Sequence, residues 1–262
     1  MLTALRDGIR IQAFEAERLG DYCCPDPACG AKLILKRGTV RIAHFAHESQ
    51  SACALARESV EHMQAKFDLC AEYRRRGFMA EVEVPVCSPV ENRRADLLVA
   101  SPRNSSLRYA IEVQDAAVGE DELWRRTRSY SAASIRTIWI SLVRPDRWSP
   151  TTSSDGALLQ EKYSPRLHER WIERLAGEIW LYDPEVRQFW NARFREHLLH
   201  REAVNFINVG LGEHIDVAAH DLRSERWVDA VVTGPWKLDQ IRISANPKRP
   251  IGSLIGQERE DN

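Results

Sequence analysis

The sequence lacks any apolar run of about 18 residues, the length that a membrane-spanning helix needs. Residues 1–20 carry charges throughout, and they contain neither the apolar core nor the small-residue cleavage site of a secretory signal. We therefore predict a cytoplasmic protein without a membrane partner. An excess of positive charge is also absent, because the formal net charge is −1. Binding to nucleic acid would depend on a local arrangement of charges rather than on a generally basic surface.

Several catalytic signatures are absent as well. The sequence has no Gly-rich phosphate-binding loop, no Ser/His/Asp or Cys/His nucleophile pattern and no internal repeat. It has 262 residues, of which 44% are hydrophobic and 29% are charged. This composition is typical of a globular protein, and the length allows two domains or one large domain with an appendage.

The clearest periodic signals lie between residues 57 and 145. Apolar residues from Val60 to Ala71 recur at helical spacing, which predicts a helix over 57–76 that ends at Gly77. Three strands are predicted next, at 80–86, 95–100 and 109–114, followed by a helix at 120–133 and a strand at 136–143. The predicted order is helix, three strands, helix, strand, which is a mixed α/β arrangement.

Two segments flank this part of the chain. Residues 1–56 are rich in turn-forming residues, and we predict a small module of short strands there. Residues 144–156 are rich in Ser, Thr and Pro, as a linker would be. We therefore place domain boundaries after residues 56 and 145, and residues 146–262 form a predicted C-terminal accessory domain of unknown role. Within the first predicted strand of the central domain, Glu81 and Glu83 alternate with valines and are expected to face solvent.

Cysteine is concentrated in the first fifth of the chain, where Cys23, Cys24, Cys29 and Cys53 lie near a histidine pair. In a cytosolic chain such a cluster indicates metal rather than disulfides. Cys24, Cys29, His44 and His47 form a tetrahedral ligand set for a structural Zn²⁺, with Cys23 or Cys53 as substitutes. The alternative is that some of these thiols are reduced and merely buried.

Acidic side chains interrupt the apolar pattern of two inner strands. Glu112 and Gln114 are two residues apart and share one face of their strand. If the preceding strand pairs with it, Asp96 and Glu112 converge on one Mg²⁺ or Mn²⁺ ion. The alternative is a polar cross-strand pair at an exposed edge. The spacing of Asp96, Glu112 and Gln114, within this order of helices and strands, resembles the PD-(D/E)xK nuclease superfamily. Glutamine stands at 114, where that superfamily usually has lysine.

The helix before the strands offers a replacement for that lysine. Glu58, His62 and Lys66 are each four residues apart and are expected to form a stripe along one helix face. Lys66 would supply the missing positive charge, and His62 or Glu58 would assist the metal or the water. The alternative is a solvated face with pairing of opposite charges.

The second helix carries candidate phosphate-binding residues. Arg126 and Tyr130 are four residues apart, with Thr127 beside them, and an arginine there could hold a phosphate by paired hydrogen bonds. A structural role that bridges helix and sheet is the alternative.

As a series, "CPDPACG", "HFAH", "ESVEHMQAK", "RRADLLV", "IEVQ" and "RRTRSY" look like the competence protein CoiA family. The resemblance covers about residues 20–145. It implies a restriction-endonuclease-like α-β-β-β-α-β core behind an N-terminal cysteine and histidine segment. It also implies a role in handling incoming DNA during natural transformation or recombination. The matching residues are Asp96, Glu112 and Gln114 in the nuclease core motif, Glu58, His62 and Lys66 in the helix motif, and Arg126, Thr127 and Tyr130 in the following helix.

Two features depart from the family pattern: the cysteine spacing is wider than usual, and the segment after residue 150 matches nothing recognisable. The preferred interpretation is a Mg²⁺-dependent deoxyribonuclease with DNA, and recombination proteins, as partners. One rival is a recombination-accessory protein that binds DNA without cleaving it. The other is a defence or mobile-element nuclease with the same chemistry.

Overall fold

The computed structural model describes residues 1–262 apart from 50, 105, 209, 211, 245–250 and 257–262. The N-terminal module, residues 1–56, is a five-stranded antiparallel sheet in the order β2-β1-β3-β4-β5. Its strands are β1 (Thr3–Arg6), β2 (Ile9–Gln12), β3 (Tyr22–Cys23), β4 (Lys32–Lys36) and β5 (His44–His47). A short 3₁₀ helix, η1 (Ala54–Arg57), connects the module to the rest of the chain.

The central elements follow the predicted order of helix, three strands, helix and strand. They are α1 (Val60–Arg75), β6 (Met79–Val86), β7 (Arg93–Ala100), β8 (Arg108–Gln114), α2 (Glu120–Ala132) and β9 (Ile135–Leu142). α1 begins three residues later than predicted because Ser59 caps it: its Oγ accepts the His62 backbone N–H at 3.1 Å. Gly77, with φ +80°, follows the helix as expected for a C-terminal glycine.

The chain beyond β9 extends the same sheet in part. Its elements are β10 (Thr151–Thr152), β11 (Leu158–Tyr163), α3 (Leu167–Ala176), β12 (Ile179–Asp183), β13 (Gln188–Arg201), β14 (Val204–Asn208), β15 (Glu213–Val217), β16 (His220–Lys237), η2 (Leu238–Gln240), β17 (Ile241–Ser244) and β18 (Ser253–Gly256). Five of these strands, β10 to β13 and β16, extend the sheet, whereas β14 pairs with β15 and β17 with β18 in separate two-stranded sheets. One nine-stranded sheet has the order β10-β11-β16-β13-β12-β9-β8-β7-β6.

Continuity of this sheet corrects the predicted boundary at residue 145. β12 pairs in parallel with β9, and β9 also pairs in parallel with β8. Seven of the eight β9 residues are buried, and such an inner strand needs partners on both edges. Strands β11, β12, β13 and β16 therefore belong to the same sheet as β6 to β9, so the sheet continues across the predicted boundary. The polar stretch 144–156 is a surface turn that contains β10.

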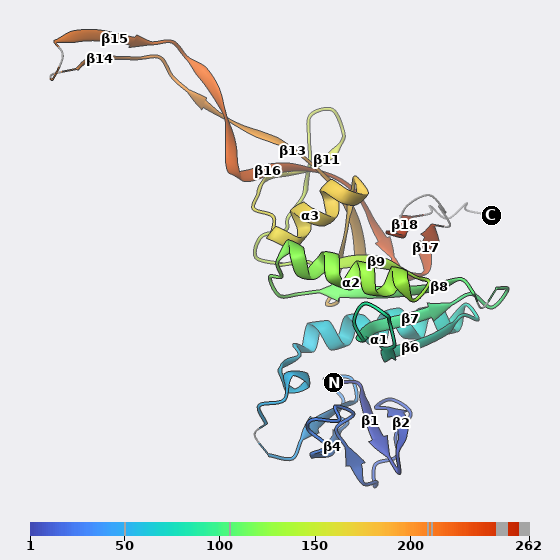
Figure 1. Cartoon of the computed structure of the whole chain (residues 1–262). Coiled ribbons are helices and arrows are strands. Elements are labelled where there is room, and N and C mark those ends of the chain that lie inside the picture. Colours follow the sequence, from blue (N-terminus) through green and yellow to red (C-terminus); the bar gives the residue numbers. More distant parts are fainter. Residues whose placement is uncertain (50, 105, 209, 211, 245–250, 257–262) are drawn as a thin grey trace, which may run out of the picture.

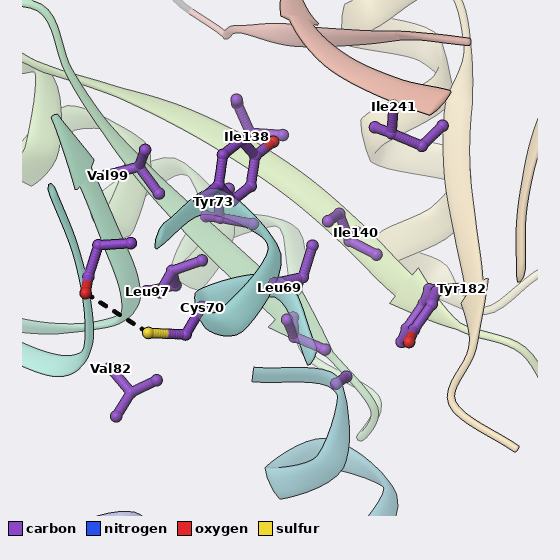
Figure 2. Close-up of a cluster of buried hydrophobic side chains, with 14 of the residues drawn as sticks. Leu69, Cys70, Tyr73, Val82, Leu97, Val99, Ile138, Ile140, Tyr182 and Ile241 are labelled. Atoms are coloured by element: carbon purple, nitrogen blue, oxygen red, sulfur yellow. Dashed lines mark hydrogen bonds between the residues drawn. The ribbon is translucent and has the colours of Figure 1, made fainter. Parts of the chain in front are cut away.

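The helices cover opposite faces of the sheet. Ile111 and Val113 of β8 pack in one buried cluster with α1, whereas Ala110 packs with Tyr130 of α2. Since neighbouring strand residues face opposite ways, α1 and α2 lie on different faces, as Figure 1 shows. Figure 2 shows the α1 side of the core, where Cys70 Sγ donates to the Ala80 carbonyl oxygen at 3.4 Å. None of the described helices is long and apolar enough to cross a membrane.

The burial of Glu83 differs from the prediction. This residue was expected to face solvent with Glu81, but it is 1% exposed and has φ +54°, an uncommon conformation for a residue with a side chain. Its carboxylate lies between α1 and the N-terminal module, where it accepts hydrogen bonds from Lys66 Nζ (2.8 Å) and Thr3 Oγ1 (2.6 Å). The pattern of alternating residues fails here because the backbone turns the side chain to the buried face.

A long two-stranded arm leaves the sheet. The ends of β13 and β16 continue beyond it, and β14 and β15 pair antiparallel at its far end, well away from the body in Figure 1. We call residues 198–223 the arm. Its exposed apolar side chains include Val204, Phe206, Ile207 and Leu222.

Candidate active site and metal centre

A cleft of about 1050 Å³ brings most of the predicted catalytic residues together. Those that line it are Glu58, His62, Asp96, Glu112, Gln114, Arg126 and Tyr130. Its other lining residues are Asp26, Leu55, Ser59, Glu91, Asn92, Arg93, Arg94, Val113, Asp115 and Ala116. Lys66 and Thr127 are not among the described residues that line it. The cleft therefore combines the start of α1, the ends of β7 and β8, Arg126 and Tyr130 on the sheet-facing side of α2, and part of the N-terminal module.

Asp96 and Glu112 meet where β7 and β8 stop pairing. Leu97 and Ile111 form the last paired position, so the backbone N–H groups just beyond it have lost their ladder partners. The carboxylates replace those partners reciprocally. Val113 N–H donates to Asp96 Oδ2 at 3.0 Å, and Asp96 N–H donates to Glu112 Oε1 at 3.3 Å. Both acids are therefore fixed by main-chain contacts at one point of the cleft.

Glu112 lies under α2 and is 2% exposed. Tyr130 Oη donates to its Oε1 at 2.7 Å, and Arg126 Nη1 lies 3.3 Å from its Oε2. Burial, together with the charge of Asp96, raises the pKa of Glu112 to about 7, although Arg126 and Tyr130 oppose that shift. Without a cation nearby, Glu112 is therefore only partly ionised near neutral pH.

His62 connects Asp96 to Glu58. Its Nε2 lies 3.2 Å from Asp96 Oδ2, and its Nδ1 lies 2.9 Å from Glu58 Oε1. Burial alone would lower the pKa of His62, but the charge of Asp96 and hydrogen bonds to both carboxylates raise it to about 10. Burial would likewise raise the pKa of Asp96, but the His62 charge lowers it to about 2. One ligand atom each from Glu58, His62 and Asp96 lies within 4.8 Å of the others, so this group could hold a metal ion.

Lys66 is placed differently from the prediction. Its side chain is completely buried, and its ammonium contacts Glu58 and, at 2.8 Å, Glu83. It therefore acts on the cleft through Glu58 instead of pointing into it. Glu58 precedes α1, so the predicted stripe begins in the connection to the helix. The alternative of a solvated charged face is wrong, because the side chains of Glu58, His62 and Lys66 are at most 18% exposed.

The remaining predicted residues divide between the cleft and the core. Gln114 lines the cleft, and its Nε2 donates to the Ala116 carbonyl oxygen at 2.6 Å. Arg126 is 31% exposed and also contacts Glu122. Thr127 is 2% exposed and accepts a hydrogen bond from Trp139 Nε1 at 3.3 Å. Thr127 therefore lies against the sheet and not in the cleft.

Sequence reasoning missed the other lining residues of the cleft, and three of them make contacts that shape it. Asp26 lies in the loop between Cys24 and Cys29, Ser59 caps α1, and Asp115 accepts a hydrogen bond from Ser59 Oγ at 2.7 Å. Ser59 could have been found, because a serine directly before a periodic apolar run is a helix-start signal. Nothing in the local sequence marks Asp26 or Asp115 as cleft residues.

The N-terminal module gathers Cys24, Cys29, His47 and Cys53 into one group whose ligand atoms all lie within 4.8 Å of one another. The Sγ atoms of Cys24 and Cys53 are 3.9 Å apart, and Cys29 Sγ lies 3.4 Å from His47 Nε2. Tetrahedral Zn²⁺ with ordinary bond lengths would require about 3.8 Å for two sulfurs and about 3.5 Å for sulfur and nitrogen. The donor set and its spacing therefore fit zinc.

Cys53 takes the place of His44 in the predicted ligand set. His44 and His47 are three residues apart on β5, so their side chains face opposite sides and only one can face the cysteines. His44 Nδ1 instead lies 3.0 Å from the carbonyl oxygen of Ile42. Cys23 is exposed, next to the buried Cys24, and is not part of the group.

The fold and this site define a mixed α/β protein with an acidic cleft and, beside it, a cysteine–histidine group that could hold a metal ion. The chain belongs to the competence protein CoiA family. Residues 58–209 match the family described as "Competence protein CoiA, nuclease-like domain", and residues 8–56 match "Competence protein CoiA, N-terminal domain". The first match extends well past residue 145, in agreement with the continuous sheet.

A relative from Bacillus subtilis (strain 168), "Competence protein CoiA", is 28% identical over 119 residues. The aligned part covers 44% of this chain and 30% of the relative, so the chain spans less than a third of that protein's length. No solved structure matches the chain.

Proposed function

We propose that the protein is a metal-dependent deoxyribonuclease that cleaves DNA phosphodiesters during DNA uptake or recombination in natural transformation. The observation that carries the proposal is the meeting of Asp96 and Glu112 at the end of β7 and β8, in a cleft that also contains His62 and Glu58. We propose that these elements form the restriction-endonuclease-like core that the order α1-β6-β7-β8-α2-β9 suggests.

The charge of the cleft supports a requirement for a divalent cation. Six acidic residues line it, Asp26, Glu58, Glu91, Asp96, Glu112 and Asp115, against the three arginines Arg93, Arg94 and Arg126. A phosphate would be repelled unless a cation neutralised part of this charge. Carboxylate oxygens are the ligands that Mg²⁺ and Mn²⁺ prefer, so the donor set fits, with Asp96 and Glu112 as ligands. A bound ion would stabilise charge on the phosphate and lower the pKa of a water molecule.

The chain's own residues then have distinct roles. Glu112 must be ionised to bind the ion, and Tyr130 already donates to the carboxylate form. Arg126 contacts Glu112, and we expect its guanidinium to turn toward the phosphate when a cation binds Glu112. Gln114 would orient water through its side-chain amide, whereas Lys66 keeps Glu58 ionised from within the core.

One observation favours the rival function of binding DNA without cleavage. Among the described residues that line the cleft there is no lysine, because Gln114 stands in the motif and Lys66 points into the core. A protein of this kind would bind DNA independently of Glu112, and it would leave the DNA intact with Mg²⁺ or Mn²⁺.

The deciding experiment is cleavage of single- and double-stranded DNA by the full chain with Mg²⁺ or Mn²⁺. Glu112→Gln keeps the size of the side chain but removes a metal ligand, and we expect it to lower the cleavage rate about a hundredfold or more. Glu213→Gln, on the exposed arm, is the matched control and should cleave like wild type. Equal cleavage by wild type and folded Glu112→Gln would refute the mechanism.

We further propose that the group Cys24, Cys29, His47 and Cys53 binds a structural Zn²⁺. Four protein ligands leave no open position for a reacting group, which is typical of structural zinc. Metal analysis should find one equivalent of zinc in wild type and in Cys23→Ser, and less in Cys53→Ser. Equal zinc in Cys23→Ser and Cys53→Ser would contradict this ligand set.

A further inference from the structure

The N-terminal module forms one wall of the cleft. Asp26 and Leu55 line the cleft together with the acids of β7 and β8. Asp26 belongs to the loop that carries two of the grouped cysteines: its carbonyl oxygen accepts the Cys29 N–H at 2.9 Å, and its Oδ2 lies 3.7 Å from Cys53 Sγ. The wall is therefore built on the same residues as the cysteine–histidine group.

The module is also joined to the cleft through the chain itself. Cys53 directly precedes η1, and Glu58 directly follows it. Glu58 in turn contacts His62 Nδ1 at 2.9 Å, and His62 contacts Asp96. A single turn of helix thus separates a residue of the cysteine–histidine group from the carboxylate that orients the cleft histidine.

A second connection runs through Glu83. Its carboxylate accepts the backbone N–H groups of Leu2 (2.8 Å) and Thr3 (3.1 Å), which belong to the module. The same carboxylate contacts Lys66, whose ammonium also contacts Glu58. Leu2, Thr3, Lys66 and Glu83 are almost completely buried. The two connections meet at Glu58, which lines the cleft.

We propose that the N-terminal module is a positioning element of the cleft: the cysteine–histidine group and β1 hold Glu58, and through it His62, in place beside Asp96. The inference rests on the proposed function in that the cleft is taken to be the site that binds the divalent cation. It adds that cation binding depends on the cysteine–histidine group, although none of its four residues is among the described residues that line the cleft.

The test lengthens the connection without touching a ligand. Two glycines are inserted between Ala56 and Arg57 of the full chain, and the control carries the same insertion after Asp155, in the exposed turn between β10 and β11. Zinc content, the imidazole NMR signals of His62 (assigned with His62→Gln) and Mn²⁺ affinity are measured. We expect the first variant to retain zinc, shift the His62 signals and bind Mn²⁺ about tenfold or more weakly. The control should match wild type in all three.

Unchanged His62 signals and Mn²⁺ affinity in the zinc-retaining variant would overturn the proposal. A second comparison uses Cys53→Ser, with Cys23→Ser as its control. The His62 signals should shift in Cys53→Ser only, and unchanged signals in zinc-free Cys53→Ser would also overturn the proposal. If wild type itself binds no Mn²⁺ in a Glu112-dependent way, the proposed function fails. The His62 signals still decide the positioning role in that case.

Discussion

At the scale of single residues, the most consequential side chain is that of Glu83, which the alternation of glutamate and valine in β6 predicts to face solvent. Glu83 contributes a buried carboxylate to Lys66 and to two backbone amides of the N-terminal module. Burial alone would raise its pKa, but the charge of Lys66 lowers it to about 2. It is therefore ionised at all ordinary pH values, and its charge is matched by a buried ammonium.

Removing that charge should destabilise the protein strongly. Glu83→Gln leaves Lys66 buried with a single carboxylate, and breaking a buried ion pair costs about 3–5 kcal/mol. Glu81→Gln is the matched control, since Glu81 is exposed on the same strand and its contact with Arg10 is worth about 0–1 kcal/mol. Urea unfolding of both variants measures the difference. Equal losses of unfolding free energy would show that the pair contributes nothing specific.

His168 gives a pH dependence that lies away from the cleft. It is completely buried on α3, and its Nε2 lies 3.1 Å from Ser141 Oγ. Burial and the neighbouring Arg166 charge lower its pKa from 6.5 to about 4. Between these values the unfolded chain binds a proton that the folded protein excludes. The free energy of unfolding should therefore fall by up to about 3 kcal/mol as the pH drops from 6.5 to 4.

The check on His168 is a comparison of slopes. His168→Gln cannot take up the proton, so its unfolding free energy should fall less than that of wild type between pH 7 and pH 4.5. The difference between the two proteins isolates His168 from carboxylates that titrate in the same range. Parallel curves would mean that His168 is protonated as readily in the folded protein as in the unfolded chain.

At the scale of elements, the sequence was informative wherever a signal is local. The helix that became α1, the three strands β6 to β8, α2 and β9 could all be predicted from periodicity, and Gly77 marked a helix end. The pairing of Asp96 with Glu112 followed from two adjacent strands. Such inferences need only the direction in which neighbouring side chains point.

The errors came from geometry that no local pattern contains. The burial of Glu83 was not predicted, because it depends on a left-handed backbone conformation at that residue. Glu58 was predicted on the helix, but α1 begins at Val60. The choice between His44 and His47 depends on which face of β5 the cysteines approach. Pairing of β12 with β9 joins residues far apart in sequence, and the polar stretch between them gave no sign of it.

At the scale of the whole molecule, the core is shared across the predicted boundary at residue 145. Tyr182, Phe189 and Ile241 belong to the same buried cluster as Leu69 and Ile140, and Figure 2 shows Tyr182 and Ile241 on the side of Ile140. A fragment of residues 1–145 would expose this apolar surface and one edge of β9. It should fail to unfold cooperatively when studied by calorimetry.

A loop replacement provides the matched comparison for that fragment. Joining Arg201 to His220 by Asn-Gly, a two-residue hairpin turn, removes the outer arm but keeps β13 and β16 in register. Because the side chains of the removed part of the arm are largely exposed, the melting temperature should stay within a few degrees of wild type. A large loss of stability on removing the arm, or a cooperative transition in fragment 1–145, would contradict this division of the molecule.

The arm also determines what a break in the chain would do. β13 and β16, which lead into and out of it, pair with each other inside the nine-stranded sheet, and β16 is held on its other side by β11. A protease that cut at Arg201 or Arg223 would create two polypeptides, yet each would remain hydrogen-bonded to the other along the body of the sheet. The nicked protein should therefore elute as one particle in size-exclusion chromatography.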